Sequence, residues 1–260
     1  MKVSSERFTI SGALRKAALA SFAAIALSTL AVSARADLVI NGGFESTTNG
    51  GGQMNGTITS ATGWTNSGYN FIFTPGSADT TGVSSQYGAD DLLLWGPNDG
   101  SANGLPATSP DGGNYVGADG AFMAGPLSQT INGLTAGDSY TVGFWWAGAQ
   151  QHGFDGATTE QFQVSFGGQT QDTAVVDNAS HGFTGWQYQT FKFTADGTSD
   201  VLSFLAVGTP ISPSEPPFAL LDGVSVNAST PEPGSILLGL SVLAGMGGMG
   251  FFRSKNRVKS

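Results

Sequence analysis

Short runs in which apolar and polar residues alternate are the feature that most constrains the fold of this 260-residue chain. The clearest run spans residues 140–146, and the side chains on one of its faces are Tyr140, Val142, Phe144 and Trp146. Gly, Asn, Asp and Ser separate this run from similar ones at residues 161–166, 189–194, 201–207 and 218–227. The pattern predicts a single all-β domain, folded as a sandwich or barrel, with almost no helix between the termini.

The alternation assigns the side chains of each run to the inside or the outside of the domain. The inward side chains predicted in two of the runs are Phe162, Val164, Phe166, Phe191 and Phe193. The run 201–207 is apolar on both faces, which is typical of a central strand covered on both sides. The last run would place on a common side Phe218, Leu220, Val224 and Val226. Asp222 lies two positions from both Leu220 and Val224, so strand alternation predicts that its carboxylate is buried in the same apolar layer.

Residues 46–113 have a different composition, rich in Gly, Asn, Ser and Thr with isolated aromatic anchors. We expect long loops with a few strands there, and loops on a rigid sandwich often carry binding residues. Trp95 lies in this polar segment, whereas Trp145 lies in a strand run with a pleat direction opposite to that of Trp146. Trp95 and Trp145 are candidate platforms for sugar, because a pyranose ring has one apolar face; the alternative is core packing.

The charge of the central part of the chain limits its partners. Residues 37–230 contain a single cation, Lys192, against 17 Asp and Glu residues, which gives a formal charge of −16. A surface with so few cations cannot neutralise phosphates, so nucleic acid is excluded as a partner. The acid excess favours cations such as Ca²⁺. The chain has no cysteine, which excludes disulfides, cysteine nucleophiles and thiolate metal sites.

Residues 1–36 have the three parts of a secretory signal peptide. Basic residues precede an apolar stretch at residues 17–32, and Ala34, Arg35 and Ala36 follow as a small-residue cleavage site. We therefore expect export by the general secretion machinery, with cleavage by signal peptidase after Ala36.

Residues 228–260 predict a membrane-inserted address at the C-terminus. An apolar run at residues 235–252 and a basic tail at residues 253–260 follow the motif Pro231, Glu232 and Pro233. As a helix, the 18-residue run would extend about 27 Å, and a hydrocarbon core is about 30 Å thick. The basic tail should stay in the cytoplasm, which places the preceding chain across the membrane. The alternatives are a permanent single-span anchor and a buried core helix.

The proline motif, the Gly-rich apolar helix and the basic tail together resemble the PEP-CTERM sorting signal of Gram-negative bacteria. This resemblance implies processing by an exosortase-type transpeptidase near the motif, with the inner membrane as a transient or permanent anchor. The product would then lie at the cell surface or outside a bacterium that makes exopolysaccharide. The segments 38–45, 125–131 and 219–226 are similar to those of galactose-binding-like jelly rolls. This second resemblance implies a β-sandwich of jelly-roll type over residues 37–227.

Glu45 and Asp222 form the strongest candidate site. A buried carboxylate needs a partner, and Ca²⁺ takes carboxylate and carbonyl oxygens from loops and strand ends. In galactose-binding-like modules that this chain resembles, the Glu after the first strand and the Asp of the last strand commonly meet at a structural calcium site. The resemblance assigns that site to Glu45 and Asp222, with the Asn41 side chain or nearby carbonyl groups as further ligands. The alternative is that both carboxylates accept hydrogen bonds from backbone amides in turns.

No motif in the sequence marks a catalytic centre. The two histidines, His152 and His181, are isolated in loops, with neither a G-x-S-x-G elbow nor an H-E-x-x-H helix. No two of the many carboxylates stand out as a glycosidase pair. We therefore expect a non-catalytic surface or matrix protein that contacts polysaccharide in a biofilm or envelope. The alternatives are a secreted carbohydrate-active enzyme and a structural protein or adhesin without a small ligand.

Overall fold

The computed structural model describes residues 37–87, 92–210 and 215–229. These residues form strands, turns and loops, with no helix among them. This part of the chain accordingly offers no helix of the length and apolar character that a membrane crossing needs. Several predicted segments lie outside the described residues, namely the signal peptide 1–36, the motif 231–233, the apolar helix 235–252 and the basic tail 253–260.

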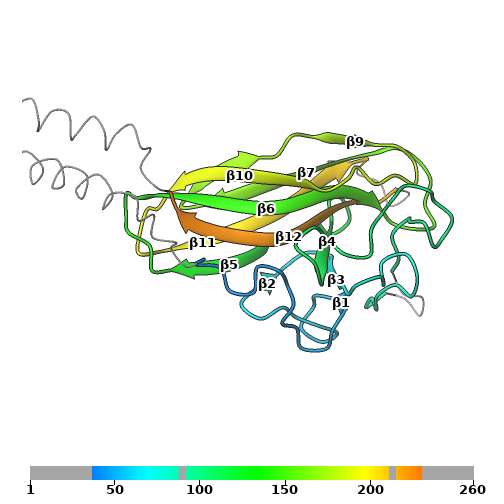
Figure 1. The fold of residues 1–260 in the computed structure, drawn as a ribbon, viewed down its shortest axis with the longest axis horizontal. Coiled ribbons are helices and arrows are strands. Elements are labelled where there is room, and N and C mark those ends of the chain that lie inside the picture. The colour runs from blue at the N-terminus through cyan, green and yellow to red at the C-terminus, as the bar shows by residue number, and fades with distance from the viewer. Residues whose placement is uncertain (1–36, 88–91, 211–214, 230–260) are drawn as a thin grey trace, which may run out of the picture. The chain divides into compact units, whose positions relative to one another are not determined.

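Two antiparallel sheets pack face to face in the described part of the chain (Figure 1). The first sheet consists, in spatial order, of β1 (Gly52–Gln53), β3 (Asn70–Phe73), β4 (Tyr115–Asp119), β12 (Pro217–Ala228), β6 (Ser139–Gln150) and β10 (Gln187–Thr194). The second consists of β2 (Thr65–Asn66), β5 (Leu127–Asn132), β11 (Ser199–Thr209), β7 (Thr158–Phe166) and β8 (Gln169–Asp172), with β9 (Val176–Asn178) also paired to β7.

The strand order is that of a jelly roll. The chain crosses repeatedly between the sheets, so that four strands of the first sheet run β4-β12-β6-β10 and four of the second run β5-β11-β7-β8. The last strands, β12 and β11, therefore lie beside the first strands of this set, β4 and β5, as in a double Greek key. This order confirms the predicted all-β class and the single β-sandwich of jelly-roll type.

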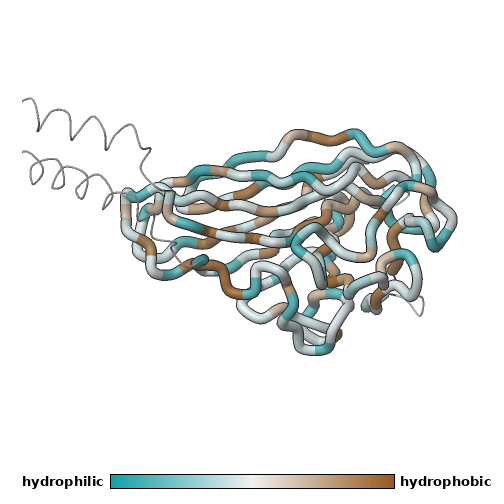
Figure 2. The backbone as a smooth tube through the Cα atoms, viewed as in Figure 1, coloured by the Kyte–Doolittle hydropathy of each residue, from teal (hydrophilic) through white to brown (hydrophobic). Residues whose placement is uncertain are grey.

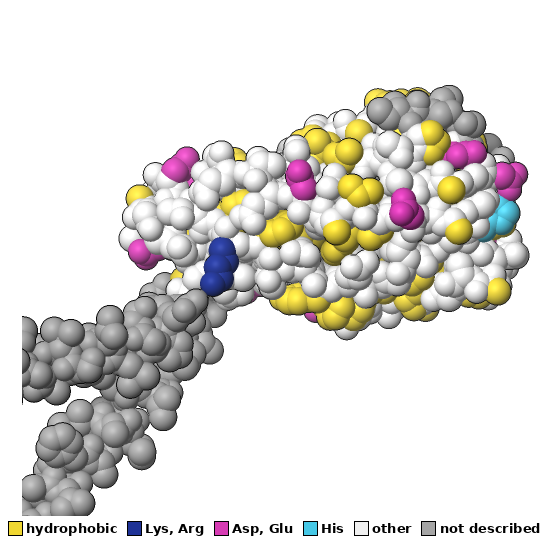
Figure 3. Space-filling model, turned by 90° about the horizontal axis from the view of Figure 1, so that it is seen from above, with side chains coloured by type: hydrophobic (Ala, Val, Ile, Leu, Met, Phe, Trp, Pro, Cys, Tyr) yellow, Lys and Arg dark blue, Asp and Glu magenta, His cyan; other side chains and the backbone are white. Residues whose placement is uncertain are grey.

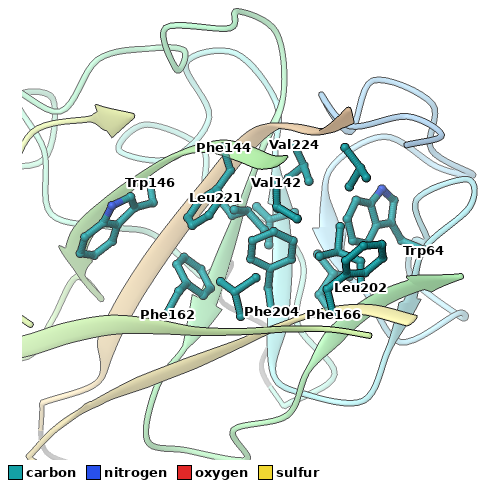
Figure 4. Close-up of a cluster of buried hydrophobic side chains, with 14 of the residues drawn as sticks. Trp64, Val142, Phe144, Trp146, Phe162, Phe166, Leu202, Phe204, Leu221 and Val224 are labelled. Atoms are coloured by element: carbon teal, nitrogen blue, oxygen red, sulfur yellow. The ribbon is translucent and has the colours of Figure 1, made fainter. Parts of the chain in front are cut away.

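The inner faces of the two sheets enclose an aromatic core (Figure 4). Its members from β6, β7 and β11 are each at most 2% exposed and include Val142, Phe144, Trp146, Phe162 and Phe204. The rings of Phe144 and Phe204 meet edge to face across the sandwich, with centroids 5.1 Å apart. Figure 2 shows the alternation of hydrophobic and hydrophilic residues along the strands. The inward directions predicted for residues 140–146, 161–166 and 189–194 are confirmed.

The last strand departs from simple alternation at a β-bulge. Asp222 pairs with Trp145 of β6, but Ser225 pairs with Gly143, so three steps along β12 match two along β6. Gly223 within the bulge has a φ of 56°, in the left-handed region that glycine adopts at little cost. After the bulge, the side chains of β12 therefore point to the face opposite to the one that strict alternation predicts.

This reversal corrects two predictions about β12. Leu220 belongs to an apolar cluster on the outer face, whereas Val224 points into the core between the sheets. The prediction that these residues share a common side is wrong. Asp222 is completely buried as predicted, but on the outer face of the first sheet rather than in the core layer.

Strand β11 is central in its sheet, but only one of its faces is covered. Its burial alternates, and Val201 and Val207 on the outer face are 55% and 41% exposed. The outer face of the second sheet is therefore open at these positions, and the predicted burial on both sides is wrong.

The loops between β3 and β4 cover part of the outer face of the first sheet. Side chains of the strands and of these loops form a second apolar cluster that includes Phe71, Phe73, Leu92, Leu94, Leu105, Tyr115, Phe218 and Leu220. The prediction of long loops with a few short strands over residues 46–113 is confirmed (Figure 1). The cluster includes Ala147 of β6 but not Trp145. It therefore does not cover the part of the outer face around Trp145, where β6 pairs with β10.

Candidate functional site

Trp145 and Tyr188 form an aromatic pair on the outer face of the first sheet. They are direct partners on β6 and β10, and their ring centroids are 5.1 Å apart with planes inclined at 57°. Tyr188 is 53% exposed and Trp145 is half-buried. A Cβ at Gly143 would overlap the Tyr188 hydroxyl, so the Tyr188 ring lies across the sheet over this glycine. The pair therefore presents aromatic surface close to the sheet.

Polar side chains, all but Lys192 short and uncharged, continue the same sheet face away from the aromatic pair. The positions with matching pleat direction on β6, β10 and β12 are Thr141, Thr190, Lys192, Ser225 and Asn227, all exposed or half-buried. Their hydroxyl and amide groups both donate and accept hydrogen bonds. Aromatic surface beside such groups suits a sugar, which has an apolar ring face and a rim of hydroxyls.

Three carboxylates meet beside this aromatic pair. Asp222, the partner of Trp145 on β12, is completely buried, whereas Glu45 and Asp111 are exposed. A Cβ placed on Gly43 would lie 3.2 Å from Oδ2 of Asp111 and 3.9 Å from Oδ1 of Asp222. The same point would lie 4.0 Å from Cγ of Glu45. The β12 bulge and two loops thus bring together acids that are far apart in the sequence.

The Asp222 carboxyl group is only half satisfied by hydrogen bonds. The Ser109 hydroxyl donates a short hydrogen bond to Oδ2, while Oδ1 has no hydrogen-bond partner. Burial raises the pKa of Asp222 to about 7, and the negative charges of Asp111 and Glu45 are smaller causes in the same direction. Hydrogen bonds from Ser109 and from the Gly223 backbone oppose the increase in this pKa. An unpartnered carboxylate oxygen beside two other carboxylates fits the oxygen ligands that Ca²⁺ prefers.

The structure brings together two of the three residues predicted to bind calcium. Glu45 and Asp222 are neighbours, and Oε1 of Glu45 accepts a hydrogen bond of 2.8 Å from the Asn114 backbone. Asn41 instead orders its own loop, since its Oδ1 accepts from the Ser46 backbone at 2.9 Å and its Nδ2 donates to the Ser46 carbonyl at 3.0 Å. Within the described residues, no three His, Asp or Glu side chains adopt the spacing of a bound metal ion. The three carboxylates therefore lie close together, but they do not surround a common point at the spacing of metal ligands.

Trp95, the other predicted sugar platform, is enclosed by the two histidines. Its ring stacks on that of His181 with centroids 3.8 Å apart and planes at 25°, and the His152 centroid is 4.2 Å away. Its Nε1 donates to the Phe154 carbonyl at 2.9 Å, and Nε2 of His181 lies 2.6 Å from Oδ1 of Asp155. These contacts leave Trp95 less free aromatic surface than the Trp145–Tyr188 pair.

A second exposed aromatic group lies on loops near the end of β4. Tyr87 and Phe122 are 59% and 42% exposed, with ring centroids 6.0 Å apart, and both pack on Tyr69. The Tyr87 hydroxyl donates to the Met123 sulfur at 3.1 Å. Asp119 is buried nearby, and burial raises its pKa to about 6 against hydrogen bonds from two backbone N–H groups. These rings face one another's edges, so they offer less continuous flat surface than Trp145 and Tyr188.

Another buried carboxyl group lies between the sheets at the start of β7. Glu160 is 1% exposed, and its Oε1 accepts a short hydrogen bond from the Thr158 hydroxyl while Oε2 has no partner. A Cβ on Gly148 of β6 would overlap Oε2, so the carboxyl group reaches the facing sheet. Burial raises the pKa of Glu160 to about 8, the charge of Asp177 adds to this increase, and hydrogen bonds from Thr158 and Asn178 oppose it. Because Glu160 is so deeply buried, we expect its carboxyl group to affect stability rather than to contact a ligand.

Sequence reasoning missed Tyr188, Ser109 and Asp111 as members of the site. Tyr188 meets Trp145 only through the register of β6 and β10, which no local pattern specifies. Ser109 and Asp111 lie in a loop without periodicity. A usable signal was present at Asp222, because a glycine directly after it inside a strand pattern often marks a bulge.

Comparisons with known proteins give limited likenesses. No family model matches the chain, and no curated protein matches it. TmCBM61 in complex with β-1,4-galactotriose has a TM-score of 0.37 and 18% identity, with 75% of this chain and 100% of that chain covered. The CBM22-1 xylan-binding domain of Xyn10C from Paenibacillus barcinonensis has a TM-score of 0.34 and 11% identity, with 73% and 92% covered. The C-terminal domain of EclA, a sugar-binding protein, has a TM-score of 0.32 and 18% identity, with 51% and 88% covered. Likenesses at this level do not assign a ligand to this chain.

Proposed function

We propose that this chain is a non-catalytic, exported protein of the cell surface or extracellular matrix whose β-sandwich binds polysaccharide. The observation that carries the proposal is the Trp145–Tyr188 pair on an open sheet face, with short polar side chains along the same strands. The apolar face of a pyranose ring would stack on the two aromatic rings. Its hydroxyls would bond to side chains such as Thr190 and Ser225. Binding of this kind needs neither a nucleophile nor a proton transfer.

Removing either ring of the pair should weaken polysaccharide binding strongly. A central aromatic contact contributes about 2 kcal/mol, so Trp145→Ala and Tyr188→Ala should each lower affinity roughly 30-fold. Tyr87→Ala is the matched control, because Tyr87 is similarly exposed but lies in the other aromatic group. Retention of the full-length protein on cellulose, xylan, galactan and chitin measures the binding, and reducing ends are assayed in the same samples.

The outcomes of this experiment test the proposed function and the proposed binding site separately. Absence of binding to every polysaccharide in the panel would contradict the proposed function. A loss caused by Tyr87→Ala instead of Tyr188→Ala would place binding at the second aromatic group. Release of new reducing ends would favour the alternative, a carbohydrate-active enzyme.

We propose further that Ca²⁺ is a structural ion of this sandwich, held by Glu45 and Asp222. The support is the buried Oδ1 of Asp222, which lacks a hydrogen-bond partner beside two other carboxylates. When bound, the ion would supply positive charge to a cluster in which the described residues place none. Ser109 would keep Oδ2 of Asp222 in position, and Asn41 would order the loop that carries Glu45.

The export route is proposed from the sequence resemblance, with an exosortase-type transpeptidase and the inner membrane as partners. Replacing Pro231, Glu232 and Pro233 with alanine should leave the C-terminus uncleaved and the protein in the inner-membrane fraction. Alanine at Ser229 and Thr230, just before the motif, is the matched control and should be processed normally. The intact mass of the protein in membrane and extracellular fractions checks this in a bacterium with an exosortase. A wild-type product that retains residues 235–260 would refute the proposed cleavage.

A further inference from the structure

The aromatic pair lies in an acidic environment, and this limits the sugars that it can favour. We infer that the Trp145–Tyr188 surface prefers a polysaccharide with protonated amino groups to a neutral or an anionic one. This inference rests on the proposed polysaccharide-binding function and names the class of ligand for that same site.

Asp111 is an exposed carboxylate beside the aromatic surface. A Cβ on Gly223 would lie 3.1 Å from Cγ of Asp111 and 3.1 Å from Cδ1 of Trp145, so the carboxylate and the indole edge flank one point above the bulge. The loop is held there because the Asp111 backbone donates to the Ser109 hydroxyl at 3.1 Å, and that hydroxyl bonds to Asp222.

An ammonium group on a sugar stacked at this pair would gain two favourable interactions. Asp111 is exposed, so its carboxylate can accept a charge-assisted hydrogen bond from the ammonium group. The faces of Trp145 and Tyr188 attract a cation through their ring quadrupoles. A neutral sugar of the same shape would retain the stacking but lose both of these contributions.

The charges around the pair support the same preference. Lys192, the only Lys or Arg in the described residues, lies four residues along β10 from Tyr188, about 13 Å away. Glu45 and Asp222 adjoin Asp111, and a Ca²⁺ ion held there would still leave one negative charge on the three carboxylates. Acidic side chains are spread over the face that Figure 3 presents, with Lys or Arg at one place only. A polyanionic glycan would therefore be repelled and a polycationic one attracted.

Two oligomers that differ only in acetylation test this inference. Calorimetry would compare a glucosamine oligomer with an N-acetylglucosamine oligomer of equal length on the full-length protein, with chelator, at a pH that protonates the amines. The glucosamine oligomer should bind roughly 10-fold more tightly, and Asp111→Asn should remove that difference. Added salt should reduce the difference as well. Asp138→Asn removes an exposed carboxylate from the turn before β6 and is the matched control.

Each outcome either supports or overturns the preference. Equal affinity for the two oligomers would overturn it while leaving polysaccharide binding intact, whereas failure of both oligomers and of the whole panel would remove both proposals. An effect of Asp138→Asn as large as that of Asp111→Asn would show that overall charge, not this site, attracts the ligand. A lysine oligomer that binds as tightly as the glucosamine oligomer would also overturn the inference, because it has no sugar ring to stack.

Discussion

Glu160→Gln should raise the free energy of unfolding by up to about 5 kcal/mol above pH 8, because the wild-type carboxyl group must then be charged inside the sandwich. The folded protein keeps this proton up to about pH 8, whereas the unfolded chain releases it near the usual value of 4.5. Unfolding therefore releases a proton between these two values, and wild-type stability falls as the pH rises through that window. Below the window, Glu160→Gln and wild type should be equally stable.

The glutamine should preserve the local contacts while removing the charge. Its oxygen can still accept the hydrogen bond from Thr158, and its size matches the space over Gly148. Urea unfolding at a series of pH values gives the slope of stability against pH for both proteins. Asp172→Asn, which removes an exposed carboxylate on β8, controls for the general effect of lowering the acid excess. If Glu160→Gln and wild type show the same slope, the raised pKa of Glu160 is refuted.

The same residue shows how far alternation predicts this fold. The inward positions of residues 161–166 were correctly predicted because an apolar side chain at every second residue can be buried only on one face. The strand in fact begins at Thr158, and two further residues of the same alternation place Glu160 inward. A polar residue at an inward position carries no hydrophobic signal, so the predicted strand began at residue 161 instead of residue 158.

The candidate site was less predictable than the fold because it depends on long-range register. The partnership of Asp222 with Trp145 could not be derived from either strand alone, and the Gly223 bulge then changed the face on which the carboxylate lies. Asp111 joins the site through a loop whose path depends on contacts with the folded sheet. The predicted pairing of Glu45 with Asp222 came from a family resemblance, and the structure places these side chains together by contacts that local periodicity does not contain.

Calcium should stabilise the wild-type protein, and Asp222→Asn should abolish that response. A ligand present at 100 times its dissociation constant adds about 2.7 kcal/mol to the free energy of unfolding. In chelator, the raised pKa of Asp222 makes wild-type stability fall as the pH rises from about 3.8 to about 7, by up to about 4 kcal/mol. The uncharged asparagine should remove this fall, since it can still accept the hydrogen bond from Ser109.

The stabilisation by calcium and the fall in stability with rising pH both depend on the proton of Asp222. This linkage distinguishes a specific ion site from general screening of an acidic protein. Because Asp222 must lose its proton to ligate the ion, calcium should stabilise wild type more at pH 8 than at pH 5, within the window set by the pKa near 7. Asp119→Asn is the matched control: Asp119 is also buried with a raised pKa, but no neighbouring carboxylate contributes to that increase. It should alter the pH dependence equally in chelator and in calcium, and keep the full calcium response. Melting temperatures of the three proteins at both pH values, with chelator or calcium, provide the measurement. A wild-type melting temperature unaffected by calcium, or an equal response in Asp222→Asn, would leave Asp222 as a buried acid held only by its hydrogen bonds within the protein.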